Sequence, residues 1–381
     1  MDFNFTESMA MLRDSAREFA DKRLKPGAQE WDEKEEIARG VYEEAAALGF
    51  FGLSVPETYG GLGADPLAYA VAMEELARGS ASFQVCVSVH NSLVCAAISA
   101  HGTAEQKKKY LPKLASGEWV GAYSLSESGA GSDAGSLSTA AVDRGDHWLV
   151  NGTKSWVTNG GFATVFLSFV STDKEAGSRG ITCLIVEKDM PGFTLGRKEK
   201  KMGLRASDTR DVTFSNARIP KSALLGDIGG GFKIAMSQLD SGRIGIAAQA
   251  VGIAQGALEE AISYAKQRKQ FGKKLSEFQM TQAKVADMAT NIAAARLLVY
   301  QAASKLAKGE KCTKEASMAK SFASRIANKA CYDAVQIHGG NGFVREFPVE
   351  RYFRDVRVTE IYEGTTEIQA LIVAREVLSG A

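Results

Sequence analysis

Apolar residues recur at helical spacing in the first third of the chain. Leu12, Ala16 and Phe19 follow one another at intervals of three or four residues, which places them on one face of a helix. Residues 67–77 consist mostly of strong helix formers. We therefore expect residues 1–118 to form an N-terminal α-helical domain.

The pattern changes to short β-rich runs over residues 119–225. Residues 165–170 and 181–186 are apolar or β-branched runs bounded by Gly and Asp, as is typical of strands. An Asn-Gly pair, Asn151-Gly152, is expected to form a turn between two further strands. Because these strands follow one another without helices between them, they predict a middle domain that is an antiparallel barrel or sandwich.

Helical spacing returns over residues 226–381. Ile244, Ala248, Val251 and Ala254 begin one long apolar stripe, which indicates a helix packed along that face. The stretch 240–243 is expected at the head of this helix. The whole chain is thus predicted to be an α+β multidomain protein that ends in a C-terminal helical bundle domain.

Composition and charge narrow the classes of function. Lys+Arg 46 against Asp+Glu 45 gives a net charge of +1, so no strong field is available to hold nucleic acid or an acidic membrane. No apolar run is judged long enough to span a bilayer, and the N-terminus lacks the pattern of a signal or transit peptide. Five scattered cysteines without a CxxC pair indicate a reducing compartment, a cytoplasmic location and no metal site.

A Gly- and Ser-rich loop at residues 126–133 is the first candidate for ligand binding. Its backbone N–H groups could surround a phosphate, and Gly129, Gly131 and Ala134 match the loose spacing of a dinucleotide motif. That motif requires a strand before it and a helix after it, whereas more strand is expected here. A Rossmann nicotinamide site is therefore not predicted.

Two further stretches combine aromatic or basic residues with glycine. Trp156 and Thr158, two residues apart on a predicted strand, would present an aromatic face and a hydroxyl on the same side. Such a pair suits a flat heteroaromatic ring such as a flavin, although a core Trp beside a turn is the simpler interpretation. Residues 268–272 contain Arg and Lys after a long helix, where they could bind a diphosphate or cap the helix dipole.

The segment Tyr362-Glu363-Gly364 carries the most informative residue. A glycine beside a carboxylate permits an unusual backbone angle and a close approach of ligand. A carboxylate in a dry pocket is a stronger base than one in water. Taken alone, Glu363 is more simply interpreted as a surface carboxylate at a helix boundary, since most glutamates are solvated.

Together these segments resemble the acyl-CoA dehydrogenase family over essentially the whole chain, most closely its short-chain, butyryl-type branch. The matching segments stand in the family's order: 126–133, 156–161, 201–207, 240–243, 268–272, 336–342 and 361–369. The resemblance implies an FAD enzyme with an N-terminal helical domain, a middle β domain and a C-terminal four-helix bundle. It also implies a homotetramer built as a dimer of dimers.

The resemblance further implies roles for individual residues. Glu363 matches the catalytic base that removes the α-proton of an acyl-CoA thioester, while flavin N5 accepts the β-hydride and an electron-transferring flavoprotein takes the electrons. The residues implied to bind the cofactor are Tyr123, Leu125, Ser126, Gly131, Ser132, Trp156, Thr158, Thr365 and Glu367. Those implied to reach the FAD of a neighbouring subunit are Arg268, Phe271, Gln279, Gln336 and Gly340. Those implied to bind the substrate are Ser132, Leu239, Asp240, Arg243, Tyr362 and Gly364.

Several alternatives stay open. The chain could be an oxygen-using acyl-CoA oxidase, a dehydrogenase of branched, cyclic or glutaryl thioesters, or a CoA-thioester-binding protein without catalysis. Residues 86–94 are expected to shape the acyl pocket, and His90 is their only basic residue, which disfavours a dicarboxylic substrate. The chain departs from the common family residues at Ser126, Ser128, Lys274 and Ala370, where Thr, Pro, Pro and Arg are frequent.

Overall fold

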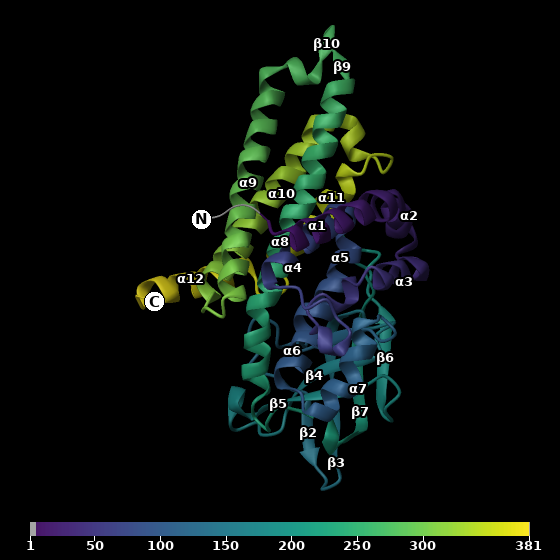
Figure 1. Ribbon diagram of the computed structural model, residues 1–381, viewed down its shortest axis with the longest axis vertical. Coiled ribbons are helices and arrows are strands. Elements are labelled where there is room, and N and C mark those ends of the chain that lie inside the picture. Colours follow the sequence, from purple (N-terminus) through teal and green to yellow (C-terminus); the bar gives the residue numbers. More distant parts are fainter. Residues whose placement is uncertain (1–4, 381) are drawn as a thin grey trace.

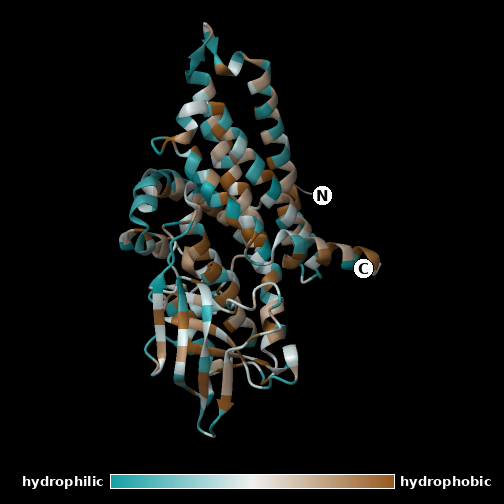
Figure 2. Cartoon of the chain, turned by 180° about the vertical axis from the view of Figure 1, so that it is seen from behind, coloured by the Kyte–Doolittle hydropathy of each residue, from teal (hydrophilic) through white to brown (hydrophobic). Residues whose placement is uncertain are grey.

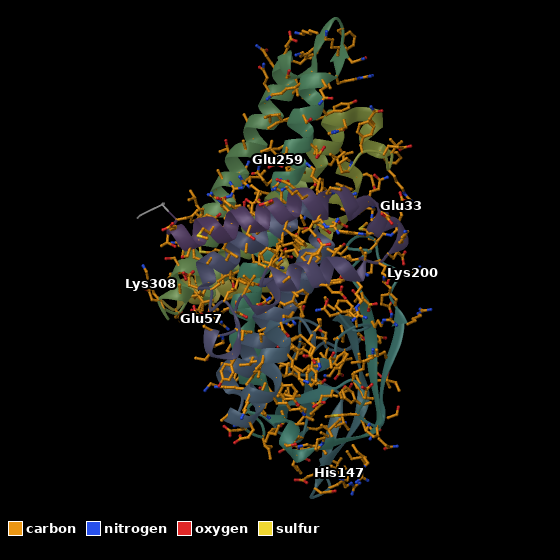
Figure 3. All side chains as sticks on the ribbon, turned by 45° about the vertical axis from the view of Figure 1, so that its right-hand side comes forward. Glu33, Glu57, His147, Lys200, Glu259 and Lys308 are labelled. Atoms are coloured by element: carbon orange, nitrogen blue, oxygen red, sulfur yellow. The ribbon has the colours of Figure 1, made fainter. Side chains whose placement is uncertain are left out.

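A computed structural model describes residues 5–380 of the chain. Figure 1 shows an elongated molecule with a β domain at one end and a bundle of long helices reaching to the other. The N-terminal helices lie between these two parts and contact both. In Figure 3, His147 marks the far end of the sheet and Glu259 lies on the bundle.

The N-terminal part is helical, as predicted. Thr6 begins its first helix by accepting a hydrogen bond from the N–H of Met9 at 3.3 Å, and Asp65 does the same for the N–H groups of Leu67 and Ala68. The helices are α1 (Glu7–Phe19), α2 (Lys25–Lys34), α3 (Arg39–Ala47), α4 (Pro66–Gly79), α5 (Ala81–Ser88), α6 (Ala96–His101) and α7 (Ala104–Ala115), with π-helical η1 (Ala20–Leu24) and η4 (Val89–Cys95) and single-turn η2 (Phe50–Gly52) and η3 (Glu57–Tyr59).

The continuous helix of α5, η4 and α6 corrects one expectation about apolar runs. Ala81–His101 has 21 residues, and an 18-residue window within it has a mean hydropathy of 1.4, so this helix is long and apolar enough to cross a membrane. The prediction that no apolar run is long enough to span a bilayer is therefore wrong, as judged by the length and composition of this helix. However, 94% of that window is buried inside the protein, which leaves no apolar face for lipid. Its composition reflects a position in the core.

The predicted β domain is confirmed as one sheet of eight strands in the described chain, ordered β6-β7-β3-β2-β4-β5-β8, with β1 paired to β4. Most pairs are antiparallel, whereas β1 and β2 each pair with β4 in parallel. The strands are β1 (Gly121–Ser124), β2 (Ala140–Asp143), β3 (His147–Thr158), β4 (Val165–Ser171), β5 (Ile181–Glu187), β6 (Phe193–Lys198), β7 (Thr209–Pro220) and β8 (Leu224–Leu225), with single-turn η5 (Gly177–Gly180) and η6 (Lys221–Ala223).

The turn predicted at Asn151-Gly152 is wrong, because β3 runs straight through it. The pairing of β3 with β7 shifts register between Val150 and Gly152, which marks a bulge rather than a chain reversal. Gly152 has a φ of 141°, and a Cβ there would lie 2.5 Å from the hydroxyl of Thr139 on the adjacent chain segment. The glycine therefore serves a close approach of backbones inside the sheet.

The C-terminal part is a bundle whose longest helix, α8, packs against α4, α9 and α10. The predicted stripe of Ile244, Ala248, Val251 and Ala254 is buried along α8. Figure 1 shows α12 extending away from the body, and Figure 2 shows a hydrophilic tip at β9 and β10. The elements are α8 (Gly231–Gln267), β9 (Lys269–Gln270), β10 (Lys273–Lys274), η7 (Leu275–Glu277), α9 (Gln279–Ala307), α10 (Thr313–His338), η8 (Gly339–Phe343), α11 (Val349–Val356), η9 (Arg357–Glu360) and α12 (Thr366–Leu378).

One helix boundary differs from the expectation. Asp240 and Arg243 lie inside α8, which already begins at Gly231, so they do not head the helix. The expected domain borders after residues 118 and 225 fall between α7 and β1 and between β8 and α8. They remain predictions.

Candidate active site

A cavity of about 1010 Å³ opens where the sheet, the N-terminal helices and the bundle meet. Its size is in the range of a binding site for a cofactor or drug-sized ligand. All three parts of the chain contribute to its walls. Of the predicted site residues, those that line it are Tyr123, Leu125, Ser126, Gly131, Ser132, Trp156, Thr158, Leu239, Arg243, Tyr362, Glu363, Gly364 and Thr365.

Glu363 occupies a tight turn between η9 and α12. Glu363 and Gly364 both have left-handed backbone angles, with φ of 51° and 93°, which is costly for a residue with a side chain. Side-chain donors hold the turn: the Nε2 group of Gln369 donates to the Gly364 carbonyl at 2.9 Å, and Lys320 Nζ donates to the same oxygen at 2.6 Å. Glu363 therefore precedes the last helix, in a turn whose strain the surrounding structure stabilises.

The space beside the Glu363 carboxylate depends on a glycine in α8. A Cβ at Gly242 would lie 2.2 Å from Glu363 Oε2 and 3.2 Å from Leu93 Cδ2 of η4. Three elements therefore converge here, and only a residue without a side chain leaves room for the carboxylate.

The Glu363 carboxylate is kept from water, although the residue as a whole is only partly buried. Within residues 5–380, its Oε2 atom is enclosed and has no hydrogen-bond partner. Burial raises the pKa of Glu363 to about 7, while the charges of Lys320 and Arg243 act against this rise. A carboxylate with such a pKa binds a proton far more readily than an ordinary glutamate does.

Arg243 brings a buried positive charge to the cavity wall. Its guanidinium donates to Asp240 at 2.6 Å, and Asp240 also accepts from the Thr313 hydroxyl at 2.7 Å. Asp240 itself does not line the cavity. In this chain it therefore orients Arg243 and ties α8 to the start of α10.

The loop and strand residues of the β domain form another wall. Trp156 has a φ of 57° at a second register shift in β3, and its side chain is 58% exposed. The bulge breaks the alternation of side chains along the strand, so alternation does not by itself place Trp156 and Thr158 on the same side. Both residues nevertheless line the cavity. The N–H of Ser155 donates to the Ser126 carbonyl at 2.9 Å, which fixes the loop against the strand.

A buried ion pair anchors this loop, and the sequence analysis missed it. Lys154 Nζ donates to Glu127 at 2.7 Å and to the Leu125 carbonyl at 3.0 Å. Glu127 also accepts from the backbone N–H groups of Ser138 and Thr139 at 2.7 and 3.0 Å. Lysine at a buried strand position between Thr153 and Ser155 was the available clue, since a buried lysine requires a partner.

Apolar side chains of α5 and η4 close one side of the cavity. Val85, Val89 and Leu93 line it, whereas His90 faces away: its Nδ1 accepts from the N–H of Gly121 at 3.0 Å. Burial lowers the pKa of His90 to about 4, so its ring is neutral. Residues 86–94 thus bring no cation to the cavity.

Seven predicted cofactor or substrate residues lie outside this cavity. Asp240 was described above, and Glu367 is in the first turn of α12. The others belong to the far end of the bundle, around β9, the start of α9 and the end of α10: Arg268, Phe271, Gln279, Gln336 and Gly340. Phe271 is 94% exposed there with a φ of 50°. These five residues are not brought to the cavity of their own chain.

Comparisons with known proteins cover nearly the whole sequence. Models of the acyl-CoA dehydrogenase N-terminal, middle and C-terminal domains match residues 6–118, 122–217 and 229–378. An acyl-CoA dehydrogenase of Bacillus subtilis (strain 168) is 49% identical over 375 residues, covering 98% of this chain and 99% of that protein.

Two solved structures share the fold almost throughout. Butyryl-CoA dehydrogenase from Megasphaera elsdenii has a TM-score of 0.97 at 43% identity, covering 99% of this chain and 100% of that one. A chain from work on the electron-transferring flavoprotein of Acidaminococcus fermentans and flavin-based electron bifurcation has a TM-score of 0.98 at 46% identity, with the same coverage. The resemblance seen in the sequence is confirmed, and this chain belongs to the acyl-CoA dehydrogenase family of flavoprotein oxidoreductases.

Proposed function

We propose that this enzyme catalyses the FAD-dependent α,β-dehydrogenation of a short acyl-CoA thioester to the 2-enoyl-CoA. The observation that carries the proposal is the Glu363 carboxylate, which lies unpartnered at the wall of a large cavity with a pKa near 7. A group of this kind is suited to general base catalysis at neutral pH.

The residues around the cavity fit a flavin. The Tyr123 hydroxyl is buried without a partner in the described structure, and the hydroxyls of Ser126 and Thr158 also line the wall. Trp156 adds an exposed aromatic ring, and such a set suits a flat ring with polar edges. Bound FAD supplies the two-electron acceptor for the hydride that leaves the β-carbon. We propose that Tyr123, Leu125, Ser126, Gly131, Ser132, Trp156, Thr158, Thr365 and Glu367 hold it.

The chain's own residues perform the proton step. Glu363 in its ionised form takes the α-proton, and its exclusion from water makes it a base matched to neutral pH. The turn held by Gln369 fixes the backbone beside the carboxylate, which lowers the entropy lost on reaching the reactive geometry. Leu239, Arg243, Tyr362 and Gly364 line the path beside it and are the proposed substrate contacts, with Ser132. Asp240, which lies outside the cavity, is proposed to serve the substrate by orienting Arg243.

The acyl group is proposed to be short and apolar. Val85, Val89 and Leu93 lie on the same side of the cavity as Glu363, since Leu93 and the carboxylate flank the same glycine. A free carboxylate on the substrate would lack a cationic partner from this wall, because His90 faces away and is neutral. The likeness to a butyryl-CoA dehydrogenase supports the same length class.

We further propose a homotetramer that passes its electrons to an electron-transferring flavoprotein. The matching chain from Acidaminococcus fermentans supports this partner. Arg268, Phe271, Gln279, Gln336 and Gly340 form no part of their own cavity, so we assign them to the FAD of a neighbouring subunit. The five cysteines are all buried and free, as suits a reducing compartment such as the cytoplasm.

Glu363→Gln tests the proposal. The amide keeps the shape of the side chain but cannot accept the α-proton, so turnover of butyryl-CoA with an artificial electron acceptor should fall by about 10² to 10⁴. The yellow colour and the affinity for butyryl-CoA should remain. A near-normal rate would overturn the assignment of the base, and a colourless wild-type protein would favour a CoA-thioester-binding protein without catalysis.

Air reoxidation separates the dehydrogenase from the oxidase. We expect the substrate-reduced wild-type protein to regain its yellow absorbance slowly when mixed with air in a stopped-flow instrument. Reoxidation as fast as turnover would instead identify an acyl-CoA oxidase. A panel of straight, branched, cyclic and glutaryl thioesters in the same assay ranks the substrates.

A further inference from the structure

Lys320 is a buried lysine beside the proposed base, and no step described so far uses it. It lies on α10, is 0% exposed and donates from Nζ to the Gly364 carbonyl at 2.6 Å. Lysine is almost never fully buried unless its charge is compensated. Glu363 is the strongest charged partner that opposes the effect of burial on Lys320.

Lys320 belongs to a polar stripe along one face of α10. Ser324, four residues further on, donates from its hydroxyl to the Thr359 carbonyl at 2.9 Å, and Asn328 makes a longer contact to the Val356 carbonyl at 3.5 Å. Residues spaced by four lie one above the other on a helix. The stripe therefore follows the segment that leads to Glu363 and holds its backbone carbonyls from one rigid helix.

The two positive charges that act on Glu363 come from two helices of the bundle. Arg243 reaches it from α8 and Lys320 from α10. Arg243 is already engaged by Asp240 at 2.6 Å, whereas Lys320 binds a neutral carbonyl. Burial lowers the pKa of Lys320 to about 8, so its ammonium is charged at neutral pH. Tyr69, Tyr123 and Tyr362 also feel the Glu363 charge, and their raised pKa values keep them neutral. Near Lys320 itself, Glu360 and Glu367 add weaker negative charges.

We propose that Lys320 is a positioning residue for Glu363: its ammonium holds the Gly364 carbonyl and supplies the positive charge that favours the ionised carboxylate. The inference rests on the proposed function, in which Glu363 is the base. Without this charge the carboxylate would bind its proton more tightly in the dry cavity, so a smaller fraction would be ready to react at neutral pH.

Lys320→Met removes the charge and the donor but keeps the length of the side chain. Loss of an opposite charge at close range raises the pKa of a carboxylate by about one to three units. The ascending limb of the pH profile of kcat/KM for butyryl-CoA should move upward by at least about one pH unit. The rate at pH 7 should then fall about fivefold or more and recover at higher pH.

Two further variants separate charge from backbone support. Lys320→Gln keeps an N–H donor without the charge, so it should move the limb as Lys320→Met does. Ser324→Ala removes a donor to the same segment and no charge, so it should lower kcat without moving the limb. If Lys320→Met yields no folded protein, Lys320→Gln decides the test, and its pH profile must show the upward displacement.

Release of α-deuterium from [2-²H]butyryl-CoA into water, measured without electron acceptor, gives a second readout of the base. The same upward displacement is expected in its pH dependence. Wild-type protein that neither releases deuterium nor turns over would contradict the proposed function. A different result would contradict only the role of Lys320. In that case the wild type is active, while Lys320→Met and Lys320→Gln are folded and yellow but the ascending limb of their pH profiles has not moved.

Discussion

The Glu363 carboxylate occupies the space that a side chain at Gly242 would fill. A Cβ at position 242 would lie 2.2 Å from Glu363 Oε2, far inside van der Waals contact. The two residues are 121 positions apart in sequence, on α8 and in the turn before α12. The glycine is therefore complementary to the base, and each constrains what the other position can hold.

Gly242→Ala should reduce catalysis more than stability. The atom that the new methyl group meets is the end of a flexible side chain, so Glu363 can move aside while the helix remains, and alanine is the better helix former by about 1 kcal/mol. A displaced base loses its reactive geometry, and a misplacement of about 1 Å can reduce the rate about 100-fold. We expect kcat to fall at least tenfold while the thermal midpoint changes little.

Gly40→Ala is the matched control for that variant. Gly40 lies in α3, and nothing stands within 4 Å of a Cβ built there. This substitution should leave turnover unchanged. Equal effects of the two substitutions on kcat, measured with the artificial acceptor, would contradict the packing argument.

Glu363→Gln should stabilise the fold above neutral pH. The carboxyl group has a pKa of about 7 in the folded protein, raised by burial from the ordinary value of 4.5. Below pH 4.5 both states are protonated and the group has no effect. Stability is lost as the pH rises through 7, because the unfolded chain ionises first. The amide of the variant does not ionise, so the variant does not lose this stability. Its free energy of unfolding should therefore exceed that of wild type by about 2 to 3 kcal/mol at pH 8.

Urea unfolding at pH 4 and pH 8 measures this difference. The gap between variant and wild type should close at pH 4, where the carboxyl group is protonated in both folded and unfolded states. A gap that is the same at both pH values would mean that the amide acts through packing and not through charge.

Lys154→Met should destabilise the protein and also loosen the Gly- and Ser-rich loop at residues 126–133, which is proposed to hold the flavin. It leaves Glu127 buried without its cation, and breaking a buried pair in this way costs about 3 to 5 kcal/mol. The double variant Lys154→Met/Glu127→Gln removes the unpaired charge and should recover part of this loss. Urea unfolding gives the stability, and the fraction of protein that keeps its yellow colour on dilution reports the loop.

A surface ion pair provides the comparison for the buried one. Lys22 of η1 and Glu18 of α1 pair at 2.6 Å with both side chains mostly exposed. Lys22→Met should therefore change stability far less than Lys154→Met does. If Lys154→Met were equally harmless, the anchoring role of the buried pair would be wrong.

Local patterns predicted the elements well and their junctions poorly. The apolar stripe beginning at Ile244 predicted a packed helix, because a 3.6-residue period appears directly in sequence. The Asn151-Gly152 pair misled, since its glycine accommodates Thr139 inside the sheet. Asp240 was expected at the start of a helix, because no local pattern indicates that α8 already begins at Gly231. In each failure the deciding contact comes from a residue distant in sequence or from another element.

The order of the motifs, and with it the family and the identity of Glu363 as the candidate base, was determined by the sequence alone. The tertiary structure decided how that base is made: Gly242 gives it room, Lys320 gives it a counter-charge, and burial raises its pKa. Desolvation and Coulomb interaction depend on distances between atoms that folding brings together. A linear chain states which groups are present, but their electrostatic environment exists only once helices and sheet have closed around them.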